Sequence, residues 1–146
     1  MKGMEIVAKD VIRVYRIGKV EIQALRGLTM SVKEGEMVSI IGPSGSGKTT
    51  LLNIVGGLDK ATAGSVLVGE NEVTALSTSQ LIEFRRKTVG HIFQNLNLIP
   101  TLTAAENVEL PMIAMGVSRG KRGERVKTLL AVIGLTDRAK HKPDEL

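Results

Sequence analysis

The sequence predicts an α/β fold built around a phosphate-binding loop and followed by a helical region. A short apolar run at residues 37–41 leads directly into a glycine-rich loop at residues 42–49. A helical stretch begins at Lys48, and strand-like and helix-like segments alternate as far as Gln94. Beyond Gln94 the apolar residues recur with helical spacing. We therefore expect an α/β core that carries the start of a helical portion.

Strands are predicted in the first region, and the amino-terminal ones are expected to form an antiparallel portion. The run at 37–41 is short, apolar and closed by glycine, which is typical of a strand buried on both faces. A charged turn at residues 33–36 precedes it. The predicted strands are residues 5–14, 22–32, 37–41, 65–68 and 89–93.

Helices are predicted from their start and stop signals. The first runs from Lys48 to about Val55, where two glycines stop it. Ser77 with Gln80, and Thr103 with Glu106, have the spacing of a capping box, so each serine or threonine should begin a helix. Pro111 is expected to bend or end the second of these helices. A further helix should bury Val126, Leu129, Leu130 and Ile133 on one face and stop at Gly134.

The loop at residues 42–49 matches the phosphate-loop pattern G-x-x-x-x-G-K-[ST] at every fixed position. Successive backbone N–H groups can converge on phosphate oxygens, and glycine lets the backbone approach them. Lys48 can reach the β- and γ-phosphates, and the Thr49 hydroxyl can bind Mg²⁺. A glycine-rich turn that binds nothing is the alternative, but the apolar run before the loop and the helix after it favour nucleoside triphosphate binding.

Composition narrows the function classes. The chain has 146 residues, a net charge of +5 and no cysteine, which excludes disulfides and thiolate metal sites. The densest basic run, residues 119–125, has no interleaved aromatic residues, so we expect a solvated helix start rather than a nucleic-acid surface. No signal-peptide core is present at residues 1–10, and the uncharged stretch 88–105 is too polar to span a bilayer.

The sequence resembles the nucleotide-binding domain of ABC transporters over essentially all of its length. Gly-Pro-Ser-Gly-Ser-Gly-Lys-Thr-Thr at 42–50 is similar to the family's Walker A loop, and the strand ending at Gln94 is similar to its Q-loop strand. Asn-Leu-Ile-Pro at 97–100 and the segment 106–111 resemble the lipoprotein-releasing and macrolide-exporter (MacB/LolD-like) type. The resemblance implies an incomplete P-loop NTPase fold, with a nucleotide-binding core at 1–94 and the start of a helical subdomain at 95–146.

The resemblance also implies roles for individual residues, with ATP and Mg²⁺ as cofactors. Tyr15 would stack on adenine, although a half-buried strand tyrosine is the alternative. Gln94 would contact Mg²⁺ or the attacking water, and Lys48 with Gln94 would carry the catalytic roles. The implied cofactor-binding residues are Tyr15, Gly42, Ser44, Gly45, Ser46, Gly47, Lys48, Thr49 and Thr50, and the implied metal ligands are Thr49 and Gln94.

The partners implied by the resemblance are a transmembrane permease subunit and a second ATP-binding subunit in a head-to-tail dimer, with no nucleic acid. The location implied is peripheral, at the cytoplasmic face of the inner membrane. An apolar cluster after Gln94 either meets the membrane partner or packs in the core; its members are Leu96, Leu98, Ile99, Pro100 and Leu102.

The family's signature sequence, Leu-Ser-Gly-Gly-Gln, is not among the 146 residues, and the sequence stops at Leu146, where that signature would start. Asp59 ends an apolar run but is followed by Lys60, so we assign it neither Mg²⁺ binding nor general-base catalysis. We expect an intact ATPase that energises export or extraction of a substrate, and a fragment that binds ATP without efficient hydrolysis. The alternatives are an ABC-type ATPase of cell division or DNA repair, and a nucleotide-binding module without catalysis.

Overall fold

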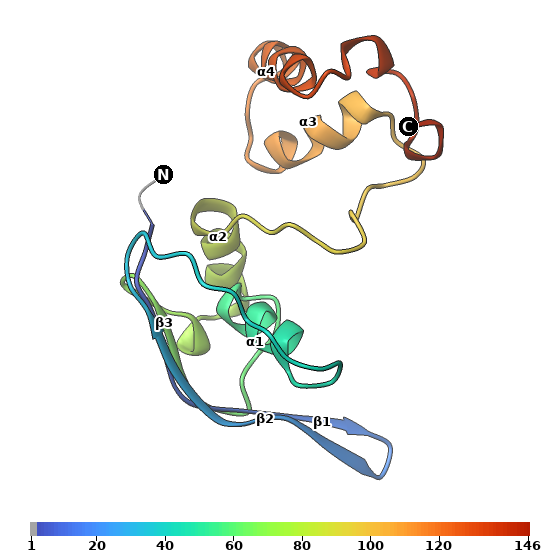
Figure 1. The fold of residues 1–146 in the computed structure, drawn as a ribbon. Helices are drawn as coiled ribbons and strands as arrows, with labels where there is room; N and C mark the ends of the chain where they lie inside the picture. The colour runs from blue at the N-terminus through green and yellow to red at the C-terminus, as the bar shows by residue number, and fades with distance from the viewer. Residues whose placement is uncertain (1–2) are drawn as a thin grey trace. The chain divides into compact units, whose positions relative to one another are not determined.

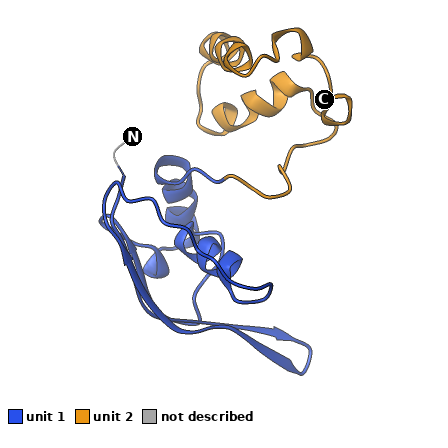
Figure 2. Cartoon of the chain, in the orientation of Figure 1, with its two compact units in different colours: residues 1–91 blue, residues 92–146 orange. Residues whose placement is uncertain are grey.

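The chain divides into two compact units, 1–91 and 92–146 (Figure 2), of which the computed structural model describes residues 3–146. The first unit contains a four-stranded antiparallel sheet in the order β2-β1-β3-β4. Its strands are β1 (Ile6–Ile17), β2 (Val20–Val32), β3 (Ala63–Val68) and β4 (Asn71–Glu72). The long β1–β2 hairpin pairs from Ile6 opposite Val32 to Ile17 opposite Val20. The α/β class and the antiparallel amino-terminal portion are confirmed.

Two helices pack on the same side of this sheet, α1 (Lys48–Val55) and α2 (Thr78–Thr88), as Figure 1 shows. A short 3₁₀ helix, η1 (Val73–Ala75), lies between β4 and α2. Ala8 and Val11 of β1 are fully buried and pack with Ile54 of α1 and Phe84 of α2. Burial of these apolar side chains holds α1, the helix that follows the phosphate loop, against the sheet.

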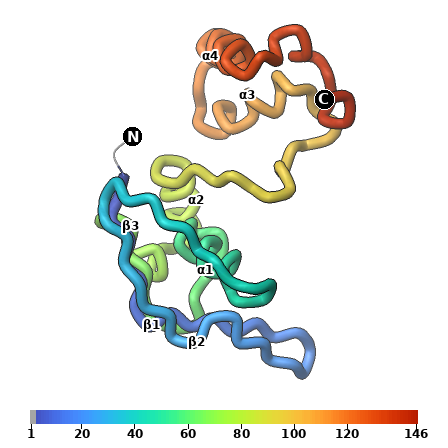
Figure 3. The backbone as a smooth tube through the Cα atoms, viewed as in Figure 1, coloured from blue at the N-terminus to red at the C-terminus, as the bar shows by residue number. Residues whose placement is uncertain are grey.

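Two predicted strands are wrong. Neither 37–41 nor 89–93 forms a strand. The first connects β2 to α1, as the backbone trace in Figure 3 shows. Met37 and Ile41 are 97% and 92% exposed, against the expectation of a strand buried on both faces. A strand is stabilised by hydrogen bonds to a neighbour, and no strand among residues 3–146 pairs with either segment. Apolar content alone therefore does not make these segments strands.

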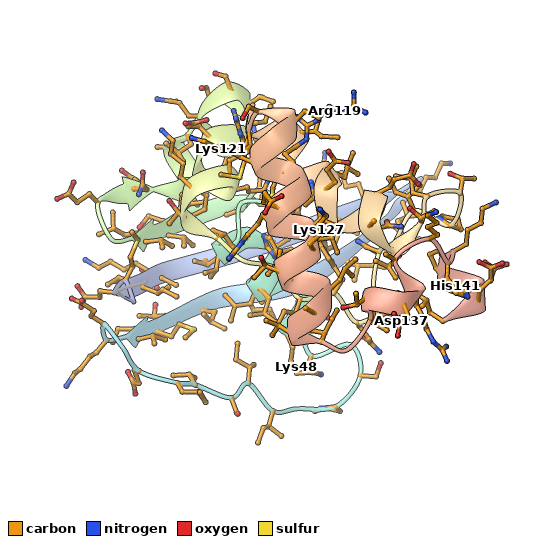
Figure 4. All side chains as sticks on the ribbon, turned by 90° about the horizontal axis from the view of Figure 1, so that it is seen from above. Lys48, Arg119, Lys121, Lys127, Asp137 and His141 are labelled. Carbon is orange, nitrogen blue, oxygen red and sulfur yellow. The ribbon has the colours of Figure 1, made fainter. Side chains whose placement is uncertain are left out.

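The second unit packs α3 (Ala104–Ala114) against α4 (Arg119–Val132), followed by the 3₁₀ turns η2 (Thr136–Arg138) and η3 (Pro143–Glu145). Its core consists of Ala104, Val126 and Leu130. The basic side chains of α4, including Arg119, Lys121 and Lys127, extend from that helix in Figure 4.

The helix start signals are confirmed, the expectation for Ile133 is wrong, and that for Pro111 is wrong in part. Ser77 with Gln80, and Thr103 with Glu106, form capping boxes at the starts of α2 and α3. Pro111 lies inside α3 and does not end it, so of the two expected effects the bend alone stays a prediction. Ile133 is 60% exposed and does not share the buried face of Val126 and Leu130, because it lies after the last residue of α4, where the helical spacing no longer applies.

Candidate functional site

The phosphate loop depends on a glycine that starts α1. Gly47 has φ +91° and precedes the first helical residue, Lys48. A Cβ built on Gly47 would lie 2.5 Å from the carbonyl oxygen of Ala24 in β2, which is closer than Cβ atoms approach other atoms in proteins. Only glycine combines this positive φ with such a close approach, so Gly47 allows the helix to begin directly against the sheet.

The start of α1 presents backbone amides to the loop. The first helical hydrogen bond is donated by the Leu51 N–H to the Gly47 carbonyl oxygen at 2.9 Å. The N–H groups of Lys48, Thr49 and Thr50 belong to the first turn, where an α-helix provides no acceptor of its own. The positive end of the helix dipole lies at the same place, and the first turn of α1 holds no acidic side chain. This arrangement favours an anion.

The Lys48 side chain folds back over the loop that precedes it. Its Nζ donates to the carbonyl oxygens of Gly42 at 2.9 Å and Pro43 at 2.7 Å, and to the Ser46 Oγ at 3.3 Å. An ammonium has three N–H donors, so the loop oxygens match its full hydrogen-bonding capacity. The Lys48 Nζ thus lies at the loop, at the N-terminal end of α1.

Tyr15 of β1 lies beside the same helix. Its hydroxyl donates to Asp59 Oδ2 at 2.6 Å, and the Thr50 Oγ1 is 3.5 Å away. The Arg13 guanidinium lies over the Tyr15 ring, 4.4 Å from its centroid. The structure therefore brings Tyr15 and Thr50 together, as neighbours of the loop residues 42–49.

Arg13 was missed by the sequence reasoning, and Asp59 was weighed there only as a metal or general-base residue. The Arg13 Nε and Nη2 bond the two carboxylate oxygens of Asp59 at 3.1 and 2.7 Å. Alternation along a strand places residues i and i+2 on one face, so Arg13 and Tyr15 could have been paired from their spacing. The contribution of Asp59, 44 residues from Tyr15, has no such local signal.

Gln94 belongs to the second unit, where it lies in a turn after Phe93. A contact between Gln94 and the phosphate loop stays a prediction. Leu96, Leu98 and Ile99 are 74%, 45% and 39% exposed, so these three members of the apolar cluster are not part of the second unit's core.

Residues 3–146, the part of the chain that the structure describes, contain neither a cluster of metal-binding side chains nor a membrane-spanning helix. No group of three or more His, Asp or Glu side chains there could hold a metal ion, and no role in metal binding is assigned to His91 or His141. None of the helices in that range is both apolar and long enough to cross a bilayer.

Comparison with known proteins gives consistent results. A family model described as "ABC transporter" matches residues 25–146. An uncharacterised ABC transporter ATP-binding protein of Thermotoga maritima is 50% identical over 145 residues, which cover 99% of this chain and 61% of that protein. The lipoprotein-releasing system ATP-binding protein LolD of Bacteroides thetaiotaomicron is 47% identical, over 86% of this chain and 57% of its own. The macrolide export ATP-binding/permease protein MacB of Rhodopseudomonas palustris is 44% identical over the full chain, which spans 22% of MacB.

Solved structures show the same likeness. The dimeric ATP-binding cassette MJ0796, in a post-hydrolysis state with ADP and Pi, superposes with a TM-score of 0.85 at 43% identity. The match covers 97% of this chain and 62% of the cassette. The chain thus spans about 60% of the length of the separate ATP-binding proteins that it matches.

Proposed function

The chain belongs to the ABC transporter family, and on that premise we propose that its loop at 42–49 binds the triphosphate of Mg·ATP. The chain is part of an ATP-binding subunit of this family, with the fold of an ABC cassette. The observation that carries the proposal is the convergence of a lysine, a helix N-terminus and a glycine-rich loop at one place.

The residues present fit a magnesium-bound triphosphate. The Lys48 ammonium already makes hydrogen bonds with three loop oxygens, so phosphate oxygens would replace these acceptors at little cost in lost hydrogen bonds. The backbone N–H groups of residues 45–50 would bond the phosphates, and Gly42, Ser44, Gly45, Ser46 and Gly47 would shape the loop. Thr49, exposed in the first turn of α1, would bind Mg²⁺ through its hydroxyl.

Tyr15 would stack on the base and Thr50 would add a hydroxyl near the phosphates. The tyrosine fits because its hydroxyl lies 3.5 Å from the Thr50 Oγ1, in the first turn of the loop helix. Gln94 would bind Mg²⁺ or the attacking water. The magnesium ion would neutralise charge on the phosphates when bound.

For the intact protein we propose ATP hydrolysis coupled to export or extraction of a substrate through a transmembrane permease. A second ATP-binding subunit in a head-to-tail dimer, at the cytoplasmic face of the membrane, completes this proposal. The relatives named LolD and MacB, and the dimeric cassette, support it. Residues 1–146 by themselves would bind ATP without efficient hydrolysis, because the family's signature sequence is not among them.

The test is calorimetric titration of the full chain with Mg·ATP and with inorganic tripolyphosphate. Lys48→Ala removes charge-assisted hydrogen bonds to phosphate, each worth roughly 1.5–3 kcal/mol, so both ligands should bind at least about tenfold more weakly. Lys19→Ala, at the tip of the β1–β2 hairpin, removes the same charge away from the loop and serves as the matched control.

Binding of both ligands by Lys48→Ala as tight as in the wild type would refute the proposal for the loop. A parallel assay of phosphate release tests the second part. Release above background in the wild type that disappears in Lys48→Ala would contradict the proposed lack of hydrolysis by residues 1–146.

A further inference from the structure

We propose that Asp59, bonded by Arg13, is a positioning residue that fixes the Tyr15 ring for a purine base, which stacks on the ring face opposite Arg13. The inference deepens the proposed function and rests on it, because it concerns the base end of the same nucleotide site. It assigns a role to two residues outside the phosphate loop.

The carboxylate of Asp59 is fully used as an acceptor. Its Oδ2 accepts from the Tyr15 hydroxyl at 2.6 Å and the Arg13 Nε at 3.1 Å. Its Oδ1 accepts from the Arg13 Nη2 and the Lys60 N–H, both at 2.7 Å. The Arg13 and Asp59 side chains are only 23% and 20% exposed, which limits the screening of this ion pair by water.

The backbone that carries Asp59 is itself held in place. The N–H groups of Leu58 and Asp59 both donate to the carbonyl oxygen of Asn53 in α1, at 2.7 and 3.2 Å. The Thr62 N–H donates to the carbonyl oxygen of Ile12 in β1 at 2.7 Å. Asp59 therefore links the end of the loop helix to the strand that carries Tyr15.

The geometry divides the two faces of the ring. The Arg13 guanidinium lies 4.4 Å from the ring centroid and covers one face by a cation–π contact. The hydroxyl bond to Asp59 restricts rotation of the ring about its Cα–Cβ bond, because that rotation would break the 2.6 Å contact. A flat base can stack only on the face that Arg13 leaves free.

The energetic effect is pre-organisation. A free tyrosine side chain loses rotamer freedom when a base stacks on it, whereas a ring already fixed by Asp59 has lost that freedom before binding. Immobilising one side chain corresponds to roughly a 2- to 10-fold change in affinity. Removing the ring altogether removes the stacking, which corresponds to roughly a 5- to 150-fold change.

The experiment measures the affinity of the full chain for Mg·ATP and for magnesium tripolyphosphate, which has no base. The variants are Tyr15→Phe, which removes one oxygen and keeps the ring, Asp59→Asn and the double variant. Each of these three should bind ATP about 2- to 10-fold more weakly and tripolyphosphate with unchanged affinity. A fourth variant, Tyr15→Ala, removes the ring and should bind ATP roughly 5- to 150-fold more weakly. The double variant should have the same affinity for ATP as the single variant that binds ATP less tightly, because both substitutions remove the same hydrogen bond.

Glu21→Gln is the matched control, since it removes the exposed Arg16–Glu21 pair of the same hairpin, also 2.7 Å long, and should leave both affinities unchanged. The chain has one tyrosine and no tryptophan, so intrinsic fluorescence reports on the Tyr15 ring alone. Without nucleotide, the tyrosine emission of Asp59→Asn should differ from that of the wild type, and the emission of Glu21→Gln should not.

Three results would overturn the inference while leaving the phosphate loop proposal intact. The first is wild-type affinity for ATP in Tyr15→Phe and Asp59→Asn together with a lower affinity in Tyr15→Ala. The base would then stack on the ring, but Asp59 would not position it. Normal ATP binding by Tyr15→Ala would exclude stacking. Equal losses for ATP and tripolyphosphate in Asp59→Asn would make the residue a structural support only. Failure of the loop proposal is separate, since it would appear as unchanged binding of both ligands by Lys48→Ala.

Discussion

Replacing Gly47 by alanine should destabilise the first unit and weaken ATP binding, for two reasons that the structure separates. The first is conformational, because φ at this position is +91° and costs a residue with a Cβ about 1–3 kcal/mol. The second is steric, because the new Cβ would lie 2.5 Å from the Ala24 carbonyl oxygen and 2.9 Å from the Leu25 Cδ2. The Ala24 carbonyl belongs to the backbone of β2, which cannot move aside as the end of a flexible side chain can, so overpacking should add about 1–3 kcal/mol.

Gly45→Ala is the matched control within the same loop. Gly45 has φ +81°, but a Cβ built there meets nothing within 4 Å. Gly45→Ala should therefore show the conformational cost alone. The entropy that alanine removes from the unfolded chain is the same for both variants and cancels in the comparison. Gly47→Ala should be about 1–3 kcal/mol less stable than Gly45→Ala.

Urea unfolding followed by Tyr15 fluorescence measures this difference. The single tyrosine lies in the first unit, so the signal follows unfolding of that unit alone. Mg·ATP titration of the folded variants should show weaker binding by Gly47→Ala, because the contact forces the start of α1 away from β2. Equal free energies of unfolding for the two variants would refute the steric reasoning.

Three further predictions test other parts of the fold. Ile54→Ala, at a position 1% exposed, should cost about 2–5 kcal/mol in urea unfolding, whereas Leu52→Ala, 57% exposed on the same helix, should stay within about 0.5 kcal/mol. The Thr103 backbone N–H and hydroxyl hold the pKa of Glu106 below its ordinary value of 4.5. Because the pKa of Glu106 is lowered in the folded state, its carboxylate stabilises α3 fully above pH 4.5, and this stabilisation is lost as the pH falls through the folded pKa. Glu106→Gln removes the titrating group and should therefore flatten the pH dependence of amide exchange in α3. Leu96→Ser, at an exposed position, should leave the free energy of unfolding within about 0.5 kcal/mol, and a larger loss would mean that this side chain is buried.

Signals that act within a few residues could be interpreted without the structure. The helix predicted from Lys48 to Val55 has those bounds, because Gly47 starts it and a glycine pair ends it. The capping boxes at Ser77 and Thr103 formed as predicted, since each needs only a side chain and a backbone amide three residues apart. The loop pattern predicted a nucleoside triphosphate site for the same reason, because a phosphate cradle is built from consecutive residues.

Contacts between distant residues decided the rest. The runs at 37–41 and 89–93 have the composition of strands, but a strand exists only where another strand pairs with it, and composition does not supply that partner. The spacing of Leu96 in the sequence did not show whether its side chain is buried or exposed, and the structure places it at the surface. Tyr15 could be assigned a base-stacking role from the family pattern. Its fixed orientation depends on Asp59, which reaches it only because α1 packs on the sheet and returns the chain to β1.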